Sequence, residues 1–532
     1  MTRERVYLKP NVLFEPLFNQ WYAWTYLIAP QTAAMIVANQ HLKIMQSFVA
    51  APQVHVAALK NPSMLGGPFL SYGAERAAEV RELHDRTAAE HAPQLRFADA
   101  VRRLDDLLAR EATGYSLEPL YRQVPEELRG YVELVYDANN HPSIRFIEGL
   151  LYRSPYYNPA AQSVALSLVE SDARPFILST PALAGDGRLH LRIPFASDAL
   201  DELFRMQAAP GSYARIREML GVPDEEDALF STFFTEAPPA PPVGYDGPGV
   251  RVRYFGHACV LVETAEVSIL CDPVASYQYE AEGERFTYAD LPSRIDYVLL
   301  THNHQDHCIF EAMLQLRHRI GQVIVPRSSG GELVDPSLKL ILRQVGFRDV
   351  VEIGEMESIP VPGGHITGVP FLGEHGDLNI KTKMAYYLSL LGRGVMCAAD
   401  SNNIEPRLYE RVRPHLGPVD VLFLGMECDG APLSWLYGPL LTRPLARRMD
   451  QSRRFDGSDF AKASAMIETL DPGQVYVYAM GQEPWLTFLT SLVYTDESRP
   501  IVESNKLVEY CRRRQVAAKR LYGCEEIMLA PG

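Results

Sequence analysis

The spacing of apolar residues differs between the two halves of the chain. From residue 250 onward, short apolar runs are bounded by turn residues, which is the pattern of buried β-strands. The runs lie at 250–254, 259–263, 267–271, 295–300, 323–326, 350–353, 366–371, 384–391, 394–400, 419–424 and 474–480. Helical patterns at 310–319, 407–412 and 460–470 are interspersed with the later runs. This order predicts two packed sheets with helices on their outer faces.

The first 236 residues have a different pattern. Residues 20–50 are dense in apolar and aromatic side chains whose spacing predicts buried helices, and residues 74–111 have the composition of a long amphipathic helical segment. A further helix is expected at 131–152, interrupted near His141, and short strands at 176–178 and 189–193. This half is therefore a helix-rich mixed α/β domain. Its aromatic segment forms a core or, alternatively, a dimer contact.

A proline-rich stretch separates the halves. Residues 237–249 contain repeated Pro and Gly, and proline has no backbone donor for a central strand or a helix interior. The predicted organisation is an N-terminal domain at 1–236, a linker at 237–249 and a catalytic domain at 250–532.

Composition narrows the class of protein. A hydrophobic fraction of 47% and a charged fraction of 22% are those of a globular protein. The net charge of −15 argues against general nucleic-acid binding. Seven scattered cysteines without a C-x-x-C pair indicate a reduced, cytoplasmic protein, and no apolar run is long enough to cross a membrane.

The candidate chemistry is concentrated in one loop. Directly after the apolar run 295–300 come His302, His304, Asp306 and His307. Imidazole and carboxylate ligands suit transition metals, and open sheets place their sites at strand ends. The spacing lets His302 and His304 converge on one ion, while Asp306 and His307 turn toward a second.

This motif, with Gly256-His257 and Asp272-Pro273 before it, resembles the metallo-β-lactamase superfamily over roughly residues 250–490. The resemblance implies an α+β protein in which an αββα sandwich with a dinuclear site at the sheet edges follows the helix-rich N-terminal domain. Asp400, at the end of an apolar strand, matches the bridging aspartate of that superfamily.

The remaining ligands depart from the hydrolytic pattern. Where those members supply a further His, this chain offers Glu374 or His375, with His365 as a weaker candidate, and residues 416–532 contain no His for the last position. A set with Glu374 would hold three imidazoles and three carboxylates, a harder site that favours iron and oxygen chemistry. A dizinc metallo-hydrolase is the alternative function.

The segments G-E-H-G-D at 373–377, A-A-D at 398–400 and G-M-E-C-D at 425–429, with the length of the chain, resemble a family of diiron β-hydroxylases of antibiotic biosynthesis. The resemblance implies an O2-dependent monooxygenase acting on an aminoacyl thioester, L-p-aminophenylalanine in chloramphenicol biosynthesis, held on a nonribosomal peptide synthetase carrier domain by phosphopantetheine. It implies an oxo- or hydroxo-bridged pair of non-haem iron ions, O2 as cosubstrate, an external electron donor, and an N-terminal domain that serves dimerisation and substrate access.

The same resemblance assigns the metal ligands. His302, His304 and Glu374 would hold one iron, Asp306 and His307 the other, and Asp400 would bridge them. Glu374 is thus expected to have a catalytic role as well.

Further candidates surround this set. Glu427, just after the run 419–424, is expected to handle protons beside the metals or, alternatively, to be a buried, salt-bridged carboxylate. The aromatic side chains Trp435, Tyr437 and Trp485 line a substrate pocket or belong to the core. The basic segment with Arg443, Arg447, Arg448, Arg453 and Arg454 docks the carrier or its phosphate, or is an ordinary solvated surface.

Overall fold

The computed structural model describes residues 5–61, 64, 66–185, 187–241 and 244–532. Two seven-stranded sheets form the C-terminal half. The first has the order β14-β13-β12-β11-β10-β9-β22 and combines an antiparallel meander, β9 to β11, with the parallel strands β11 to β14. Its strands are β9 (Val250–Gly256), β10 (Cys259–Glu263), β11 (Ser268–Cys271), β12 (Ile295–Leu299), β13 (Ile320–Pro326), β14 (Val350–Ile353) and β22 (Glu525–Leu529).

The second sheet repeats this design. An antiparallel meander, β15 to β18, is followed by the parallel strands β18 to β21. Its strands are β15 (Ser358–Val361), β16 (Gly364–Val369), β17 (Ala385–Leu390), β18 (Arg393–Cys397), β19 (Val421–Gly425), β20 (Gln474–Tyr478) and β21 (Ala517–Arg520).

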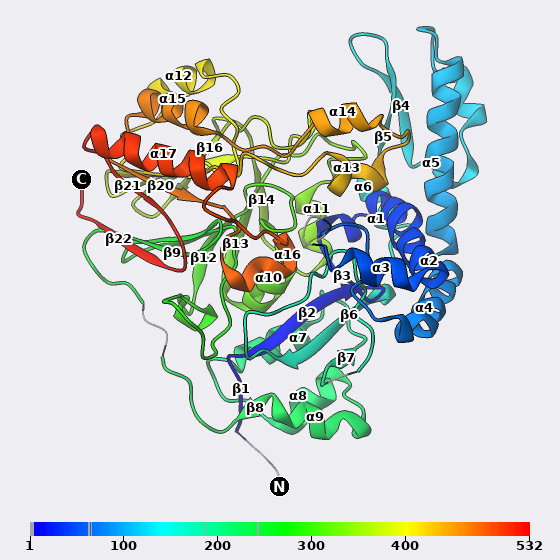
Figure 1. Cartoon of the computed structure of the whole chain (residues 1–532), viewed down its shortest axis with the longest axis horizontal. Coiled ribbons are helices and arrows are strands. Elements are labelled where there is room, and N and C mark those ends of the chain that lie inside the picture. The colour runs from blue at the N-terminus through cyan, green and yellow to red at the C-terminus, as the bar shows by residue number, and fades with distance from the viewer. Residues whose placement is uncertain (1–4, 62–63, 65, 186, 242–243) are drawn as a thin grey trace.

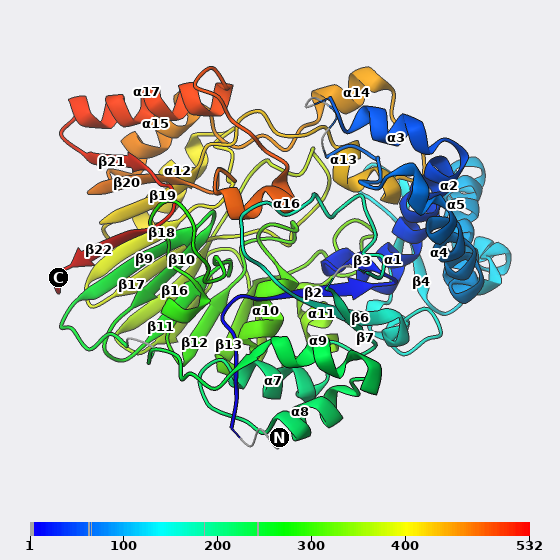
Figure 2. The ribbon, with the colours of Figure 1, turned by 60° about the horizontal axis from the view of Figure 1, so that its bottom comes forward.

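The two sheets pack face to face (Figure 2). One buried cluster draws Val252 and Val262 from the first sheet and Leu388 and Phe423 from the second. Helices cover both outer faces: α10 (Phe310–Leu316) and α11 (Leu338–Gln344) the first, and α12 (Arg407–Val412), α15 (Phe460–Leu470) and α17 (Arg499–Arg513) the second. Strands buried on both faces explain the near-continuous apolar runs. The predicted αββα sandwich is confirmed.

The N-terminal half combines a small antiparallel sheet, order β3-β2-β6-β7, with helices α1 to α5 to the right of it and α8 and α9 below it (Figure 1). The predicted helical segment at 74–111 is confirmed as two helices that meet at His91. The helices are α1 (Pro30–Ile36), α2 (Leu42–Ala50), α3 (Pro52–Ala58), α4 (Ala77–Glu90), α5 (Ala92–Glu111), α6 (Glu148–Leu151), α7 (Asp198–Arg205), α8 (Tyr213–Leu220) and α9 (Asp227–Thr232). The strands are β1 (Tyr7–Leu8), β2 (Val12–Phe18), β3 (Trp21–Tyr22), β6 (Gln162–Leu168), β7 (Leu189–Leu191) and β8 (Phe234–Thr235).

Two local predictions in this half are wrong. The expected helix at 131–152 is a hairpin of β4 (Val132–Tyr136) and β5 (Pro142–Phe146), followed by α6. Its turn is fixed by Asp137, whose carboxylate accepts hydrogen bonds from the backbone N–H groups of Asn139 and His141, both at 2.8 Å. Such side-chain bonding favours a turn over a helix. Residues 176–178 form no strand, and their Ile177 N–H bonds instead to the carbonyl of Phe488.

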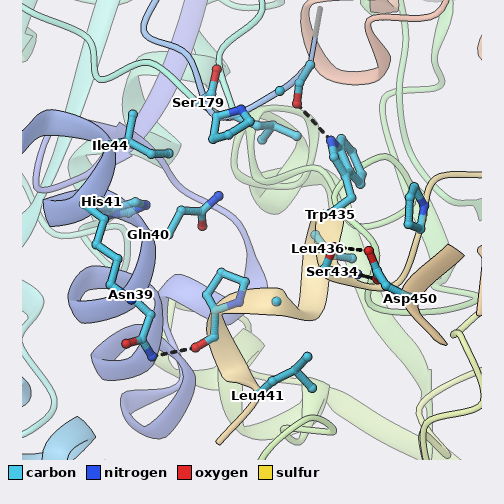
Figure 3. Close-up of a pocket in the computed structure, with 18 of the residues that line it drawn as sticks. Asn39, Gln40, His41, Ile44, Ser179, Ser434, Trp435, Leu436, Leu441 and Asp450 are labelled. Carbon is cyan, nitrogen blue, oxygen red and sulfur yellow. Dashed lines mark hydrogen bonds between the residues drawn. The ribbon is translucent and has the colours of Figure 1, made fainter. Parts of the chain in front are cut away.

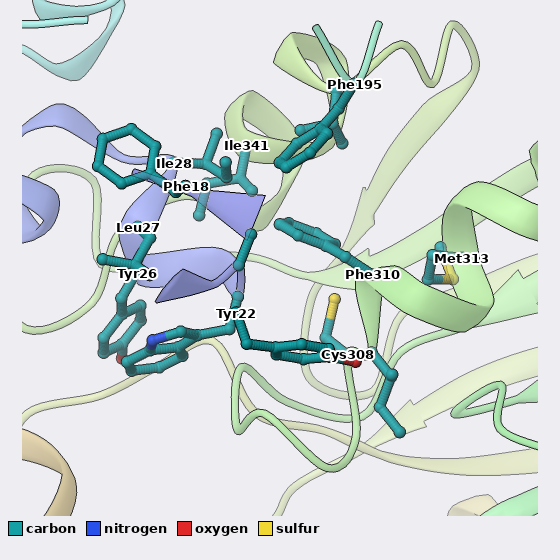
Figure 4. Packing of buried hydrophobic residues seen from close by; sticks show 14 of the residues in the cluster. Phe18, Tyr22, Tyr26, Leu27, Ile28, Phe195, Cys308, Phe310, Met313 and Ile341 are labelled. Carbon is teal, nitrogen blue, oxygen red and sulfur yellow. The ribbon is translucent and has the colours of Figure 1, made fainter. Parts of the chain in front are cut away.

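The two halves share one continuous apolar core. Phe18, Tyr22 and Ile28 of the N-terminal half lie against Phe310 and Ile341 of the sandwich (Figure 4). A buried ion pair reinforces this contact, because the Arg174 guanidinium binds both Glu311 oxygens at 3.0 and 2.9 Å. The described residues of 237–249 carry no helix or strand; positions 242 and 243 of the expected linker lie outside the described residues. Among the described helices, none combines the length and apolarity that a membrane crossing requires.

Candidate metal centre

Four loops meet at one edge of the sandwich and carry the candidate ligands. The 301–307 loop follows β12, Asp400 follows β18, Glu374 lies in the loop after β16, and His257 follows β9. The side chains of His302 and His307 are fully buried, and Glu374 is nearly so. Strand ends from both sheets therefore bring together residues that are far apart in the sequence.

One group of possible ligands consists of His302, His304 and Glu374. Glu374 Oε1 lies 2.9 Å from His304 Nδ1, and its Oε2 lies 3.6 Å from His302 Nε2. The three ligand atoms lie within 4.8 Å of one another, so a single ion at ordinary ligand distances reaches all three.

Asp400 lies between this group and a second one. Its Oδ2 is 3.0 Å from His307 Nε2 and 4.0 Å from His302 Nε2. The second group contains Asp306, His307 and also His257, whose Nε2 is 3.3 Å from Asp306 Oδ2. The site thus has room for two ions with a carboxylate between them.

All six expected ligands are brought together, whereas the two competing histidines are not in the ligand groups of the described residues. The His375 ring stacks on the His304 ring with centroids 4.5 Å apart. His365 is on β16, opposite Ser389 of β17. Glu374 is held in a left-handed backbone conformation, φ 64°, which turns its carboxylate toward the imidazoles.

Hydrogen bonds behind the ligands fix their orientation. Asp272 Oδ2 accepts from His307 Nδ1 at 2.8 Å and from the Thr301 hydroxyl at 2.6 Å. Since Thr301 Oγ1 donates to Asp272, it accepts from His302 Nδ1 at 3.0 Å. The Tyr437 hydroxyl lies 3.0 Å from His304 Nε2. Each contact leaves the other ring nitrogen free for a metal, the usual arrangement around ligating histidines.

The donor set fits two metal ions. His302 Nε2, His307 Nε2, Glu374 Oε2 and Asp400 Oδ1 are buried and have no hydrogen-bond partner among the described residues. Buried polar atoms are normally satisfied, and these four are grouped at the same site. Three carboxylates beside the imidazoles suit iron, which accepts mixed oxygen and nitrogen ligation.

The protonation preferences agree with metal binding at His302. Burial, together with the neighbouring His307 and His304 rings, lowers the pKa of His302 well below its usual value, so this ring is neutral. Burial raises the pKa of Glu374 to about 7, although His304 opposes that shift. Positive charge at the site would favour the ionised form of Glu374 that ligation requires.

A cavity of about 330 Å³ opens onto the ligands. Its wall includes Glu427, which accepts a hydrogen bond from the Tyr494 hydroxyl at 3.2 Å, and burial raises the pKa of Glu427 to about 7. Apolar and aromatic side chains from Trp435, Leu436, Phe455 and Leu489 complete the wall. Such a cavity suits an aromatic group of modest size.

A larger cavity of about 1000 Å³ adjoins the first and lies between the two halves of the chain (Figure 3). Gly66, Gly67, Gln305, Trp435 and Leu436 line both. Trp435, on α13 (Ser434–Tyr437), donates from Nε1 to the Gly66 carbonyl oxygen at 2.9 Å. The Trp435–Gly66 contact therefore stands at the boundary between the two cavities. The far wall contains His41 and Ile44, at the junction of α2 with the π-helical turn Val37–His41.

The other residues that were expected to bind the substrate or the carrier differ in where they lie and in what they contact. Tyr437 is buried and contacts His304 rather than lining either cavity. Trp485, in the short turn before α16 (Thr487–Thr490), also lies outside both cavities, and the Arg285 guanidinium is 4.4 Å from its ring centroid. Arg453 donates to the Gly376 carbonyl oxygen at 2.7 Å, and Arg454 lies 3.6 Å from Asp429. Both arginines are thus engaged within the chain.

His257, which lies 3.3 Å from Asp306, was not predicted from the sequence to lie at the metal centre. It appeared only as part of the Gly256-His257 pair, 45 positions before His302, with no second ligand nearby in the sequence. The signal that could have identified it is its place at the end of an apolar strand, the same signal that selected Asp400.

Comparisons with known proteins cover both halves. The family model described as diiron non-heme beta-hydroxylase N-terminal domain matches residues 7–238, and the beta-lactamase superfamily domain matches residues 268–431. The 4-amino-L-phenylalanyl-(CmlP-peptidyl-carrier-protein) 3-hydroxylase of Streptomyces venezuelae is 41% identical over 526 residues, 97% of this chain and 98% of that protein.

A comparison with solved structures also matches both halves of the chain. The crystal structure of CmlA, a diiron beta-hydroxylase from Streptomyces venezuelae, matches with a TM-score of 0.93 at 40% identity and covers 99% of this chain and 100% of that one. A UPF0173 protein of Pyrococcus abyssi is 36% identical over only 128 residues, 24% of this chain and 50% of that protein.

Proposed function

Because the chain belongs to the family of diiron non-heme β-hydroxylases, we propose that it hydroxylates the β-carbon of an aromatic aminoacyl group bound as a thioester to a peptidyl carrier domain. The observation that carries this proposal is the position of Glu374 against His302 and His304, which gives the site its third carboxylate. The relative from Streptomyces venezuelae is named for action on a 4-amino-L-phenylalanyl group on a carrier protein. L-p-aminophenylalanine on a nonribosomal peptide synthetase, in antibiotic biosynthesis of the chloramphenicol type, is the specific substrate we propose.

Two iron ions held by the six ligands would supply O2-dependent oxidation of the C–H bond, with electrons from an external donor. In the overall reaction the substrate C–H, one O2, two electrons and two protons yield the C–OH product and one water. His302, His304 and Glu374 would hold one ion, Asp306 and His307 the other, and Asp400 both.

The protein contributes a proton-handling carboxylate beside the ligands. Glu427 lines the metal cavity, and its pKa of about 7 allows it to hold a proton at neutral pH and to release it. The Tyr494 hydroxyl and the Asp429 N–H, at 3.2 and 3.0 Å, fix the two oxygens of this carboxylate. We assign to Glu427 the delivery of a proton to the oxygen that leaves as water.

The protein also holds the substrate and excludes water. The aromatic and apolar wall made by Trp435, Phe455 and Leu489 would receive the aromatic ring of the aminoacyl group. A buried, largely apolar site keeps bulk water from the ligands and strengthens the electrostatic interactions inside it.

The tethered substrate needs a route that an untethered amino acid does not need. The larger cavity, between the two halves, ends at Trp435 and Gly66, next to the metal cavity. We assign this cavity to the phosphopantetheine arm, which would place the thioester near Trp435 and the β-carbon near the ligands. The N-terminal half supplies most of one wall, which supports its expected role in substrate access.

Basic residues at the mouth of the larger cavity suit an acidic carrier domain or its phosphate. Arg443 lines the cavity, and Arg447 and Arg448 begin the exposed helix α14 (Arg447–Ser452). Arginine binds phosphate in a two-pronged geometry. Because Arg443, Arg453 and Arg454 all bond within the chain, Arg443 to Asp105 Oδ2 at 3.2 Å, the docking surface we propose is Arg447 and Arg448.

Two expectations about the assembly extend the proposal. Exposed aromatic side chains on the N-terminal half, such as Tyr115 and Tyr121, support a homodimer through that half, which analytical ultracentrifugation tests.

All seven cysteines lie within the described residues and are free thiols. Free thiols are typical of a reducing compartment, which supports a cytoplasmic enzyme that acts alongside the carrier.

The direct test uses the whole protein loaded anaerobically with Fe(II). Metal analysis should give two irons per chain, and intact-mass analysis of the carrier after O2 and a reductant are added should give a product one oxygen atom heavier. A protein that takes up zinc in preference, and cleaves the thioester without adding oxygen, would contradict the proposal. The same amino acid without the carrier should react far more slowly.

A further inference from the structure

We propose that Trp24, Tyr26 and Tyr437 form a chain of aromatic rings that carries electrons to the metal centre when O2 has reacted there and no substrate is bound. The inference rests on the diiron centre of the proposed function and gives the site a second activity, the reduction of O2 to water. Without substrate, oxidising equivalents left at the site would otherwise be consumed by the side chains around it. The chain joins the ligand His304 to the wall of the large cavity.

The chain begins at Tyr437, which is fully buried. Its hydroxyl oxygen lies 3.0 Å from His304 Nε2, and its ring centroid is 6.0 Å from that of His304. Among the described rings that contact His302 or His304, Tyr437 is the one tyrosine or tryptophan, and the others are His and Phe. Tyrosine and tryptophan lose one electron far more readily than phenylalanine or histidine. Tyr437 is therefore the ring beside these ligands that gives up an electron first.

Tyr26 is the next ring, and it is also fully buried. Its centroid is 6.0 Å from that of Tyr437, and its hydroxyl oxygen accepts a hydrogen bond from the Tyr437 hydroxyl. Tyr26 in turn donates to the Val334 carbonyl oxygen at 2.7 Å. Donation thus runs in one direction, from His304 Nε2 through both hydroxyls to that carbonyl. Because each hydroxyl proton has a fixed acceptor, each tyrosine can lose and regain an electron without releasing a proton to solvent.

Trp24 ends the chain at the large cavity, where it is 8% exposed. Its ring centroid is 4.6 Å from that of Tyr26. Trp24 caps the 3-10 turn Thr25–Leu27, and the Thr25 hydroxyl donates to the Asn303 carbonyl oxygen at 3.2 Å, which holds this turn against the loop of ligands. Charge is more stable beside water than in an apolar interior. The positive charge left by a departing electron therefore favours Trp24 over the two buried tyrosines.

Electrons and protons balance for this activity. Reduction of one O2 to two waters takes four electrons and four protons. In hydroxylation the external donor supplies two of the electrons, and the substrate C–H bond supplies the other two. Without substrate, the last two electrons pass one at a time from Trp24 through Tyr26 and Tyr437, and the external donor reduces Trp24 again after each transfer. The protons are taken up from solvent at the metal cavity.

The position of Trp24 makes the chain depend on whether a carrier is bound. The large cavity is the one that we assign to the phosphopantetheine arm, so a bound arm would cover Trp24 and separate it from the donor. Trp21 lines the same cavity, but its ring stacks on His41 with centroids 3.9 Å apart and has no described ring contact with Tyr26. Trp21 therefore provides a matched control for Trp24.

The test uses the whole, iron-loaded protein, reduced without excess reductant and then mixed with O2 in the absence of carrier. Freeze-quench EPR should detect a tryptophan radical, whose spectrum narrows in protein that contains ring-deuterated tryptophan. Trp24→Phe should abolish this signal and leave a tyrosyl radical in its place. Tyr26→Phe, which keeps the Tyr437–His304 contact, should also abolish the tryptophan signal. Trp21→Phe should leave it unchanged.

Repeated cycles of reduction and exposure to O2 give an independent measure. Peptide mass analysis should find added oxygen on the 301–307 loop, with loss of iron, in Trp24→Phe and Tyr26→Phe but not in the wild type or Trp21→Phe. Iron content before the first exposure identifies a variant that has failed to fold. If Tyr26→Phe fails in this way, Trp24→Phe decides, because it removes none of the hydrogen bonds that join the two tyrosines.

A tryptophan radical that persists in both Trp24→Phe and Tyr26→Phe would overturn the proposal. A wild type that hydroxylates the carrier-bound substrate, yet forms no protein radical while it consumes O2 without substrate, contradicts the chain of rings and leaves the hydroxylase intact. A loaded protein that consumes no O2 contradicts both.

Discussion

The indole of Trp435 donates a hydrogen bond of 2.9 Å to the carbonyl oxygen of Gly66, and this bond joins the two halves of the chain at the boundary between the large cavity and the metal cavity. A residue at such a boundary can act on the passage of a tethered substrate without touching the metals. A mutation of this contact should therefore affect entry of the tethered substrate without changing the metal centre, and the two effects can be measured separately.

Trp435→Phe removes this hydrogen bond and keeps an aromatic ring. Loss of one hydrogen bond of about 0.5–1.5 kcal/mol should change kcat/KM for carrier-bound substrate by about two- to twelvefold, with iron content unchanged. Steady-state kinetics checks this against Tyr522→Phe, an exposed aromatic truncation between β21 and β22. Equal kcat/KM values for the two variants would show that Trp435 does not take part in substrate access.

Asp272→Asn tests the hydrogen bonds behind the ligands. Asp272 accepts from His307 Nδ1 and from the hydroxyl and the N–H of Thr301, so the amide substitution disturbs the orientation of His307. Iron affinity should fall by about 10- to 100-fold, measured by competition with a chelator. Asp349→Asn, at an exposed carboxylate bonded to Gln322, is the matched control and should bind iron normally.

Glu427 should control the pH dependence of turnover. If Glu427 supplies a proton, activity is present below its pKa of about 7 and declines as the pH rises through it. Glu427→Gln should lower kcat by about 10²- to 10⁴-fold and abolish this decline.

Tyr494→Phe provides the complementary test at the same carboxylate. The Tyr494 hydroxyl lowers the pKa of Glu427 by donating to it, so the variant should shift the decline to higher pH. A profile that stays unchanged in Tyr494→Phe, or a decline that persists in Glu427→Gln, would contradict the assignment.

Glu148 should make the stability of the fold depend on pH. It is buried between α1 and α11, where Oε2 accepts from Gln31 and from the Ser337 N–H, and burial raises its pKa to about 7. The folded state therefore binds the Glu148 proton more tightly than the unfolded state. The free energy of unfolding should decrease between about pH 4.5 and pH 7, by at most about 3 kcal/mol.

Glu148→Gln isolates this effect from other titrating groups. The neutral amide keeps an acceptor for both donors, so the difference in unfolding free energy between wild type and variant should change across that pH range and level off above it. Urea denaturation at several pH values measures the difference. A difference that is constant with pH would show that Glu148 does not titrate in the folded protein with a raised pKa.

Arg447→Glu with Arg448→Glu tests the docking surface. Both side chains are exposed on α14, so reversal should leave folding and iron content intact but raise KM for the loaded carrier by roughly tenfold at low salt. Arg512→Glu with Arg513→Glu on α17 makes the same charge change on a helix that covers the second sheet. If both double variants raise KM equally, the effect is general charge repulsion rather than docking.

Much of the sandwich could be predicted from apolar spacing. The bounds of α12 and α15 agree with the sequence interpretation, and the buried strands β9 to β13 read as apolar runs because both of their faces are covered. The last strands, β21 and β22, were not predicted. β21 completes the second sheet at its edge, where exposed and half-exposed residues alternate, so its sequence lacks an apolar run.

The site was predictable where its ligands are adjacent in the chain and not where the fold assembles them. His302 to His307 form a motif, and Asp400 ends an apolar strand, but the choice between Glu374 and His375 depends on backbone conformation. The approach of His257 to Asp306 depends on the packing of β9 beside the 301–307 loop. Periodicity also failed at 131–152, where the Asp137 turn produces a hairpin.

Tracing the origin of the product oxygen distinguishes an oxygenase from a hydrolase. The iron-loaded protein, a reductant and the aminoacylated carrier are mixed under ¹⁸O2 in ordinary water, and the released product is analysed by mass spectrometry. An oxygenase should place one ¹⁸O atom in the hydroxyl group at the β-carbon. A product without ¹⁸O, or a cleaved thioester with oxygen from water alone, would contradict it.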